Sequence, residues 1–352
     1  MTTQSVKNQR GEIEFRKKLY LQQVEGQKVF DDEFDTAGAE KILRDRMGKT
    51  LAQMTQLRDR GISLSPYLEI GAERGQRSLI LENDLGASGA AVDISFDLLK
   101  SCRHYQKVFN KTKAPTRVCC DANNLPFMTN SIPFIFCYET LHHFPEPTPI
   151  VEELHRVLLP DGHFFFDEEP YKKVLRFSLY KAPKIYSSRS RGRSVMWKAL
   201  DRFFSYQSCN EVEHGVIENH DIPIAQWRRA LELFNTIDVK LKPVDHSSMQ
   251  SSLFGPRSYL KYLLAYLLGG TVSGICQKSP VGAGRELSIR GTFICPSCKQ
   301  TGSEVPLHGD DSSFRCSACS KVYPVVDDVV FLFAHDRFAE LYPDVFRSYV
   351  SR

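Results

Sequence analysis

The feature that most constrains the fold is a short apolar stretch, residues 67–71, that runs directly into a turn containing glycines. Residues 69–75 read Glu-Ile-Gly-Ala-Glu-Arg-Gly, and a helical pattern follows from about residue 75. Glycines at a strand-to-helix turn let the backbone approach a ligand closely, and the N-terminus of the next helix offers free N–H groups. The turn therefore suits an anionic group, a carboxylate or a phosphate equally well.

Short apolar stretches alternate with helical stretches over the following hundred residues. The expected strands are residues 67–71, 90–94, 117–121, 132–138 and 163–167, with helices over residues 97–105 and 148–158 between them. Later strands are expected at residues 236–241 and 271–277, and a helix is expected before the second of these. This alternation predicts an α/β fold with a doubly wound, mostly parallel sheet.

Acidic side chains stand at the ends of the first three expected strands. Glu69 precedes the glycine turn, Asp93 lies 22 residues after Gly71, and Asp121 follows the third strand. Doubly wound sheets bind ligands at the carboxyl ends of their strands, and an acid after the second strand can accept hydrogen bonds from ribose hydroxyls. A nucleoside is the expected ligand of this edge.

The run from residue 67 to residue 168 resembles the class I methyltransferase family, of the type 11 kind, which uses S-adenosylmethionine. The motifs that carry the resemblance are E-x-G-x-x-x-G, V-D-I-S, D-A-x-x-L-P-F, Y-E-T-L-H-H-F and E-L-x-R-V-L-x-P-D-G. A nicotinamide dehydrogenase is the natural competitor, but the turn lacks the third glycine of G-x-G-x-x-G and such an enzyme gives no reason for the Asp121 motif.

The resemblance implies a Rossmann-like fold and a role for each motif. The turn at residues 71–75 would meet the methionine end of the cofactor with Glu69 supporting it, Asp93 would bind the ribose, and Asp121 with Ala122 would bracket the adenine. The complete predicted cofactor set is Glu69, Gly71, Ala72, Gly75, Asp93, Ile94, Asp121, Ala122 and Tyr138. Glu73 departs from the family, which usually has glycine there, and its side chain would crowd the cofactor or reorder the turn.

Candidate catalytic residues follow the fourth strand. Methyl transfer from a sulfonium needs a positioned acceptor and, for some acceptors, a base. The candidates are Glu139, His142 and His143, because histidine titrates near neutrality. The alternative is that the two histidines cap the strand or pack against Phe144. Glu168 and Glu169, after the fifth strand, are alternative bases. The motif N-P-P-Y or D-P-P-Y, typical of the family's enzymes for exocyclic base amines, does not follow this strand.

A basic segment interrupts the strand and helix rhythm after residue 170. Residues 172–202 contain ten lysines and arginines, interleaved with aromatic residues, and a single acid, Asp201. Insertions at this place in the family usually shape the acceptor pocket, and a cationic, aromatic lid suits a phosphorylated or nucleic-acid acceptor. A solvated helical cap with its own small core explains the composition equally well.

The C-terminal region contains a cysteine pattern typical of a structural metal site. Cys295 and Cys298 form one C-x2-C, and Cys316 and Cys319 form a second after 17 intervening residues. Four thiolates complete the tetrahedron of a structural Zn²⁺ and leave no position open for catalysis. With the expected hairpin at residues 322–332, the module resembles the zinc-ribbon activators of methyltransferases that act on tRNA, rRNA and release factors, and here it would act in cis.

These patterns predict five regions along the 352 residues. They are an N-terminal helical segment (1–62), a methyltransferase domain (63–280) with a lid insertion (about 171–235), a linker (281–291), a zinc ribbon (292–333) and a helical tail (334–352). We expect deletion of residues 291–352 to lower solubility or thermal stability more than cofactor affinity.

The expected function is transfer of a methyl group from S-adenosylmethionine to an acceptor, with a small molecule favoured. The acceptor is an anionic or phosphorylated compound on this interpretation. The alternatives are an RNA methyltransferase that uses the basic lid and the ribbon, and a catalytically inactive cofactor-binding scaffold. The N-terminus carries no apolar signal segment, and the cysteine usage suits reduced thiols, so we expect a cytoplasmic protein without a transmembrane segment.

Overall fold

The computed structural model describes residues 3–27, 36–172, 215–243, 251–253, 259–284 and 287–350, together with scattered positions between 174 and 206. The longer helices are α1 (Thr3–Val24), α2 (Thr36–Asp59), α3 (Gln76–Asp84), α4 (Phe96–Val108), α5 (Pro147–Val157), α9 (Ile224–Leu231) and α10 (Tyr259–Leu268). The C-terminal region adds α11 (Pro296–Lys299), α12 (His335–Leu341) and α13 (Pro343–Tyr349). Short 3-10 turns are η1 (Ala122–Asn124), η2 (Leu141–His143) and η4 (Ile289–Thr292).

The central sheet contains the strands that the apolar stretches predict. These are β1 (Tyr67–Ile70), β2 (Gly89–Asp93), β3 (Thr116–Cys119), β4 (Ile132–Tyr138), β5 (Leu158–Tyr171), β8 (Thr236–Pro243) and β10 (Gly270–Gln277). Their order is β3-β2-β1-β4-β5-β10-β8. The five strands β3, β2, β1, β4 and β5 are parallel to one another, whereas β10 runs antiparallel to both β5 and β8. The predicted doubly wound, Rossmann-like sheet is confirmed.

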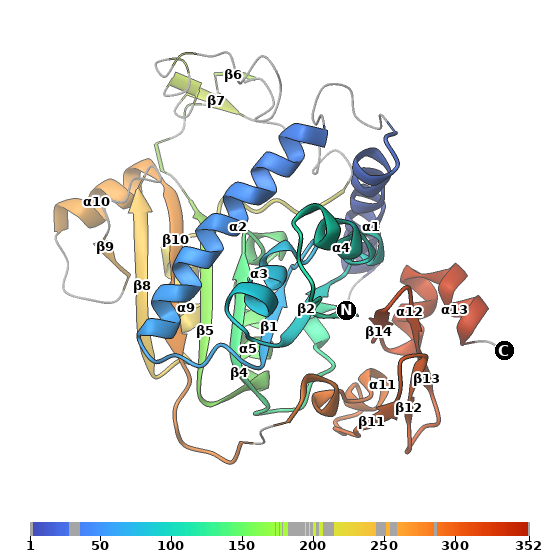
Figure 1. The fold of residues 1–352 in the computed structure, drawn as a ribbon. Helices are drawn as coiled ribbons and strands as arrows, with labels where there is room; N and C mark the ends of the chain where they lie inside the picture. The colour runs from blue at the N-terminus through green and yellow to red at the C-terminus, as the bar shows by residue number, and fades with distance from the viewer. Residues whose placement is uncertain are drawn as a thin grey trace.

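Helices cover both faces of this sheet (Figure 1). On one face, Tyr67 and Phe136 pack with Met54 of α2 in one buried cluster. On the other face, Leu68 packs with Trp227 of α9 in a second buried cluster. Successive residues of a strand point to opposite faces, so the burial of every residue of β1, and of all but one residue of β4, is the expected pattern for strands covered on both sides.

The cysteine-bearing region extends the sheet instead of standing apart from it. Strands β11 (Leu307–Gly309), β12 (Ser313–Cys316), β13 (Val322–Val326) and β14 (Val329–Phe331) form an antiparallel ribbon. The last strand, β14, also pairs in parallel with β3, with Val330 opposite Val118. The expected hairpin is confirmed, and its second strand covers what would otherwise be an exposed sheet edge.

The tail folds back over the same edge as two helices, α12 and α13, so the expected helical tail is divided in two. Pro343 begins α13 and cannot continue the hydrogen bonding of α12, which explains the break. Phe331 and Phe338 are completely buried, in a cluster that also contains Cys119 of β3. Each buried phenylalanine contributes about 1.5–3 kcal/mol, so the tail fastens the ribbon to the sheet.

Helix α1 contacts both this C-terminal region and the carboxyl ends of the parallel strands. Ile13 lies in the same buried cluster as Phe331 and Phe338. The Arg10 guanidinium donates to the Glu340 carbonyl of α12 over 3.0 and 3.2 Å. The polar face of α1 is thereby held next to the carboxyl ends of β1, β2 and β3. Among the described residues, no helix combines the length and the hydrophobicity that a membrane span requires.

Candidate functional site

The turn after β1 brings the backbone close to the end of β4. Gly71 has φ +66°, and a Cβ placed on it would lie 2.4 Å from Thr140 Oγ1, so no side chain fits at this position. The Glu69 carboxylate accepts from Ser78 N over 2.9 Å and from Ser78 Oγ over 2.6 Å. Burial raises the pKa of Glu69 to about 7. Glu69 thus fixes the first turn of α3, and Gly71 and Gly75 shape the loop before it.

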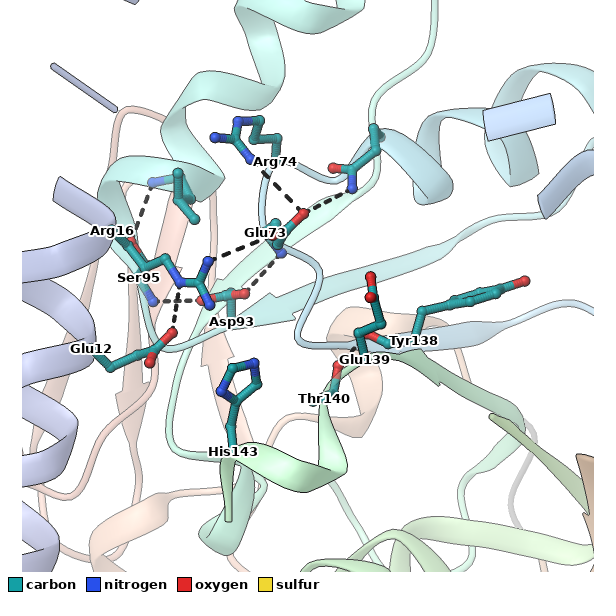
Figure 2. Close-up of polar contacts among 12 residues, drawn as sticks. Glu12, Arg16, Glu73, Arg74, Asp93, Ser95, Tyr138, Glu139, Thr140 and His143 are labelled. Atoms are coloured by element: carbon teal, nitrogen blue, oxygen red, sulfur yellow. Dashed lines mark hydrogen bonds and ion pairs between the residues drawn. The ribbon is translucent and has the colours of Figure 1, made fainter. Parts of the chain in front are cut away.

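Asp93 connects two turns at the carboxyl ends of β1 and β2. Its carboxylate accepts from Glu73 N over 2.8 Å and from Ser95 N over 2.8 Å (Figure 2). Burial raises the pKa of Asp93 to about 6, although these two amide hydrogen bonds oppose that rise. Each carboxylate oxygen can accept more than one hydrogen bond, so Asp93 keeps the capacity to accept from a ligand.

Glu73 occupies the position where glycine was expected, in a left-handed conformation with φ 49°. Its carboxylate lies 3.3 Å from Arg46, 3.7 Å from Arg16 and 3.8 Å from Arg74. Burial opposes ionisation, but these guanidinium groups hold the pKa of Glu73 well below its usual range. In Figure 2 the carboxylate turns toward Arg74 while the backbone N–H faces Asp93. Glu73 therefore neutralises cations that α1 and α2 bring to this edge.

Asp121 follows strand β3 and contacts helix α1. Its carboxylate accepts from Asn123 N over 2.9 Å, which caps η1, and from Gln9 Nε2 over 2.8 Å. Gln9 in turn accepts from Arg337 of α12. The predicted neighbours Ala122 and Ile94 are partly buried, and the Ile94 carbonyl accepts from the Tyr342 hydroxyl. The structure thus brings Glu69, Asp93 and Asp121 to one edge, as expected.

The residues after β4 point in different directions. The Tyr138 hydroxyl donates to Gln53 Oε1 over 2.9 Å, and the ring points away from Asp93 in Figure 2. Glu139 has φ 48° and pairs with Arg46 over 3.0 Å. Only backbone atoms of Tyr138 therefore face the edge with Asp93, whereas Glu139 joins the charge network around Glu73.

The two histidines of η2 have different partners. His142 Nδ1 lies 3.0 Å from Glu169, and its Nε2 lies 3.5 Å from Glu218. Burial opposes protonation, but these two carboxylates raise the pKa of His142 to about 10. His143 Nδ1 lies 2.9 Å from the Ile217 carbonyl. In Figure 2 the His143 ring points toward Arg16 and Asp93.

The alternative bases are already engaged. Glu169 is fully buried and accepts from the backbone N–H groups of Thr140, Leu141 and His142. Glu168 pairs with Lys49 over 2.7 Å. Glu169 thus acts as a cap for η2 and as the partner of His142.

Sequence reasoning missed Gln9, Arg16, Arg46 and Glu218, which contact the predicted site. These residues lie in α1, in α2 and in the segment before α9, far from the motifs. Of the basic lid, only Lys172 and Lys181 lie among the described residues, and Lys172 is exposed. The remaining lid cations, on which the acceptor argument was based, lie outside the described residues.

The four ribbon cysteines meet at one point. The sulfur atoms of Cys295 and Cys319 are 3.6 Å apart, those of Cys298 and Cys316 are 3.7 Å apart, and all four lie within 4.8 Å of one another. Sulfurs at the corners of a zinc tetrahedron are about 3.8 Å apart. The donor set and its spacing therefore fit a tetrahedral metal ion. The Tyr323 hydroxyl lies 3.0 Å from Cys295 Sγ as an outer partner.

The central part of the chain is similar to a known protein family. Residues 68–166 match the family Methyltransf_11, described as a methyltransferase domain. No curated protein sequence matches the chain. The family match and the order of the sheet agree: residues 68–166 are similar to a methyltransferase domain, and the sheet is consistent with the Rossmann-like fold of S-adenosylmethionine-dependent methyltransferases.

Solved structures with similar folds include three methyltransferase-related chains. A chain of the complex between the Haloferax volcanii Trm112 methyltransferase activator and a candidate methyltransferase is 17% identical, with TM-score 0.40, over 69% of this chain and 94% of that chain. A Methanosarcina mazei S-adenosylmethionine-dependent methyltransferase is 18% identical, with TM-score 0.37, over 62% and 96%. A candidate sarcosine dimethylglycine methyltransferase from Galdieria sulphuraria is 14% identical, with TM-score 0.42, over 76% and 99%.

Proposed function

We propose that this chain is an S-adenosylmethionine-dependent methyltransferase that transfers a methyl group to a small-molecule acceptor. The observation that carries the proposal is the position of Asp93, at the end of β2 and bonded to the backbone of the turn after β1. A carboxylate there is placed to accept hydrogen bonds from both hydroxyls of a ribose. The methyltransferase domain match over the same residues supports a sulfonium nucleoside as the ligand.

We place the remaining cofactor contacts at the same carboxyl edge of the sheet. We assign the adenine to Asp121 and Ala122, and the amino-acid end of the cofactor to the turn at residues 71–75. Arg16 and Arg46 reach this turn from α1 and α2, where they now pair with Glu73. Guanidinium groups are suited to binding a carboxylate, so we assign the cofactor carboxylate to these two arginines.

The bound cofactor would supply an activated methyl group, and the protein would position the acceptor and take its proton. We assign the proton to Nε2 of His143. A carbonyl oxygen only accepts hydrogen bonds, so the contact with the Ile217 carbonyl places the imidazole proton on Nδ1 and leaves a lone pair on Nε2. His142, which lies between two carboxylates, and Glu139, which pairs with Arg46, would act as positioning residues.

Transfer of tritiated methyl groups into fractionated cell extract tests the proposed reaction. We expect the label to enter the small-molecule fraction with the wild-type chain and to be absent with His143→Ala. Label in the RNA fraction would contradict the small-molecule assignment. A chain that binds S-adenosylmethionine but labels no fraction would support the inactive scaffold.

Substitutions of Glu73 distinguish the effect of its charge on cofactor binding from the effect of its size. We expect Glu73→Gly to bind S-adenosylmethionine about tenfold more tightly, a gain of about 1.4 kcal/mol. The change frees Arg16 and Arg46 for the cofactor carboxylate, removes a like charge, and places glycine at a φ of 49° that glycine adopts readily. Calorimetric titration of the cofactor measures the difference.

Glu73→Gln is the matched control because it keeps the length of the side chain and removes its charge. We expect its affinity to lie between those of the wild type and Glu73→Gly. Weaker binding by both variants would mean that the Glu73 carboxylate contacts the cofactor ammonium, which would contradict the assignment of the arginines.

RNA methylation is a second candidate, favoured by a cationic cavity where the ribbon meets the sheet. The cavity has a volume of about 360 Å³, and its lining includes the basic side chains Arg103, Lys107, Arg117 and Arg290, against the single acid Asp328. Basic clusters bind phosphates, and such binding weakens steeply as salt rises. An RNA affinity that falls with salt, and falls further in Arg290→Ala, would favour this candidate over the small-molecule reaction.

We also propose that Cys295, Cys298, Cys316 and Cys319 hold a structural Zn²⁺, and that the ribbon stabilises the methyltransferase domain in cis. The sulfur spacing and the pairing of β14 with β3 support this role. A module of this size has too little core to fold alone, so the metal would contribute much of its folding free energy.

A further inference from the structure

A second group of ligand-type side chains lies outside the ribbon, where η2 meets the segment before α9. His142, Glu218 and His220 each present a nitrogen or oxygen atom, and these atoms all lie within 4.8 Å of one another. His142 Nε2 is 3.5 Å from Glu218 Oε2, and His220 Nε2 is 3.0 Å from the same oxygen. Two imidazole nitrogens thus converge on one carboxylate.

The orientation of His142 is set by a buried carboxylate behind it. Glu169 is fully buried and lies 3.0 Å from His142 Nδ1, which directs Nε2 toward Glu218. Glu169 is itself held by three backbone N–H groups of residues 140–142. A carboxylate behind a histidine ring is the usual outer partner of a metal-bound imidazole, because it fixes the ring and raises its basicity.

The segment that carries Glu218 and His220 is fastened to η2 by backbone hydrogen bonds. Asn219 N donates to the His142 carbonyl over 2.9 Å, and Asn219 Nδ2 donates to the Pro145 carbonyl over 3.1 Å. At its far end, Lys172 N donates to the Ile222 carbonyl over 2.8 Å. The three ligand atoms are therefore brought together by the fold and do not depend on an ion to gather them.

The charge balance of the group favours a cation. Glu218 has only 7% of its side chain exposed, and its ion-pair partners in the described structure are the imidazoles of His142, His143 and His220. Glu169 and Glu218 bring two buried carboxylates to opposite sides of the His142 ring. Buried charges are costly unless they are paired or coordinate a metal, and a divalent ion would neutralise both.

We propose that His142, Glu218 and His220 form a binding site for a divalent first-row transition ion, with Glu169 as the outer partner of His142. Imidazole ligands suit Zn²⁺, Fe²⁺ and Ni²⁺, whereas Mg²⁺ and Ca²⁺ prefer oxygen ligands alone. Three protein ligands leave at least one coordination position open, unlike the four thiolates of the ribbon. His220 is exposed, with 59% of its side chain accessible, so an ion can reach the site from solvent.

The site lies beside His143, the residue to which the methyl acceptor's proton is assigned, because the rings of His142 and His143 have their centroids 4.4 Å apart. An acceptor that carries a hydroxyl, carboxylate or phosphate oxygen would coordinate there and be oriented toward His143. This part of the inference rests on the proposed function. The existence of the metal site does not, because it requires neither a cofactor nor an acceptor.

Metal analysis and calorimetry with Zn²⁺ on the full-length chain test the site. We expect the zinc-reconstituted wild type to contain two Zn²⁺ per chain, one in the ribbon and one at His142, Glu218 and His220. Titration of Zn²⁺ into protein that already holds the ribbon ion should show one further site, and Mg²⁺ should produce no heat. His220→Ala and Glu218→Gln should each weaken this further site at least tenfold and leave the ribbon ion in place.

His308→Ala is the matched control, because it removes an exposed imidazole on β11, outside the cluster. It should retain two Zn²⁺ per chain. His220 is exposed, so its replacement is compatible with an intact fold, and circular dichroism with the melting temperature verifies this. Only one Zn²⁺ per wild-type chain after reconstitution would overturn the proposal. A second Zn²⁺ bound equally well by His220→Ala and Glu218→Gln would also overturn it. Both results are independent of methyl transfer.

Discussion

Replacing Asp93 with alanine is expected to weaken S-adenosylmethionine binding at least about a hundredfold. Hydrogen bonds to a charged group contribute about 1.5–3 kcal/mol each, and the variant would lose two of them to the ribose. It would also leave Glu73 N and Ser95 N without the acceptor that now joins their two turns. Equilibrium binding of radiolabelled cofactor, with the melting temperature of the free chain, measures both effects.

Two further substitutions separate ribose binding from damage to the turns. Asp93→Asn keeps one oxygen acceptor, so it should bind the cofactor with intermediate affinity. Asp97→Asn removes a carboxylate in the first turn of α4 that faces Lys17 and Lys100, and it should bind like the wild type. Unchanged binding by Asp93→Ala would contradict the assignment of the ribose to this residue.

Replacing Cys316 with serine is expected to lower the melting temperature by about 7 °C. Loss of the ribbon ion removes much of the folding free energy of the ribbon. Because β14 pairs with β3 and Phe331 lies in the buried cluster with Cys119, we expect the loss to reach the central sheet. A loss of about 5 kcal/mol corresponds to roughly 7 °C for a chain of 352 residues, whose unfolding entropy is about 2.1 cal/mol/K per residue. Thermal unfolding followed by circular dichroism measures it.

Cys276→Ala is the matched control for this prediction. Cys276 is a buried free thiol on β10 that lies outside the ribbon. We expect it to lower the melting temperature by only a few degrees, as a small buried truncation does. Equal shifts for Cys316→Ser and Cys276→Ala would mean that the ribbon thiolates hold no stabilising metal. At temperatures below the melting transition of Cys316→Ser, its affinity for the cofactor should stay close to that of the wild type although its stability is lower. The same is expected for deletion of residues 291–352.

The strands of the central sheet were predictable because their residues carry a local pattern. Short apolar stretches bounded by turn residues predict β1 and β4 well, since both are buried on two faces. The pairing of β14 with β3 was not predictable, because a short apolar strand does not encode which partner it will join. The break between α12 and α13 was within reach of the sequence, since Pro343 is a plain signal.

Some residues of the candidate site were predictable from the sequence and others were not. Glu69, Asp93 and Asp121 each follow a strand, so their common edge follows from the parallel topology alone. Arg16 and Glu218 reach the site from α1 and from the segment before α9. Their places depend on how distant elements pack, and no local motif marks them. The sequence alone shows that Glu73 departs from the family pattern, but its pairing with Arg16 depends on how α1 packs against the turn.

Calorimetric titration of the wild-type chain with S-adenosylmethionine, and separately with its demethylated product, tests the central claim most directly. We predict one binding site per chain for each compound, with micromolar affinity or better. The absence of binding heat for both compounds, in a chain with an intact melting transition, would contradict the claim that the edge formed by Glu69, Asp93 and Asp121 binds a sulfonium nucleoside.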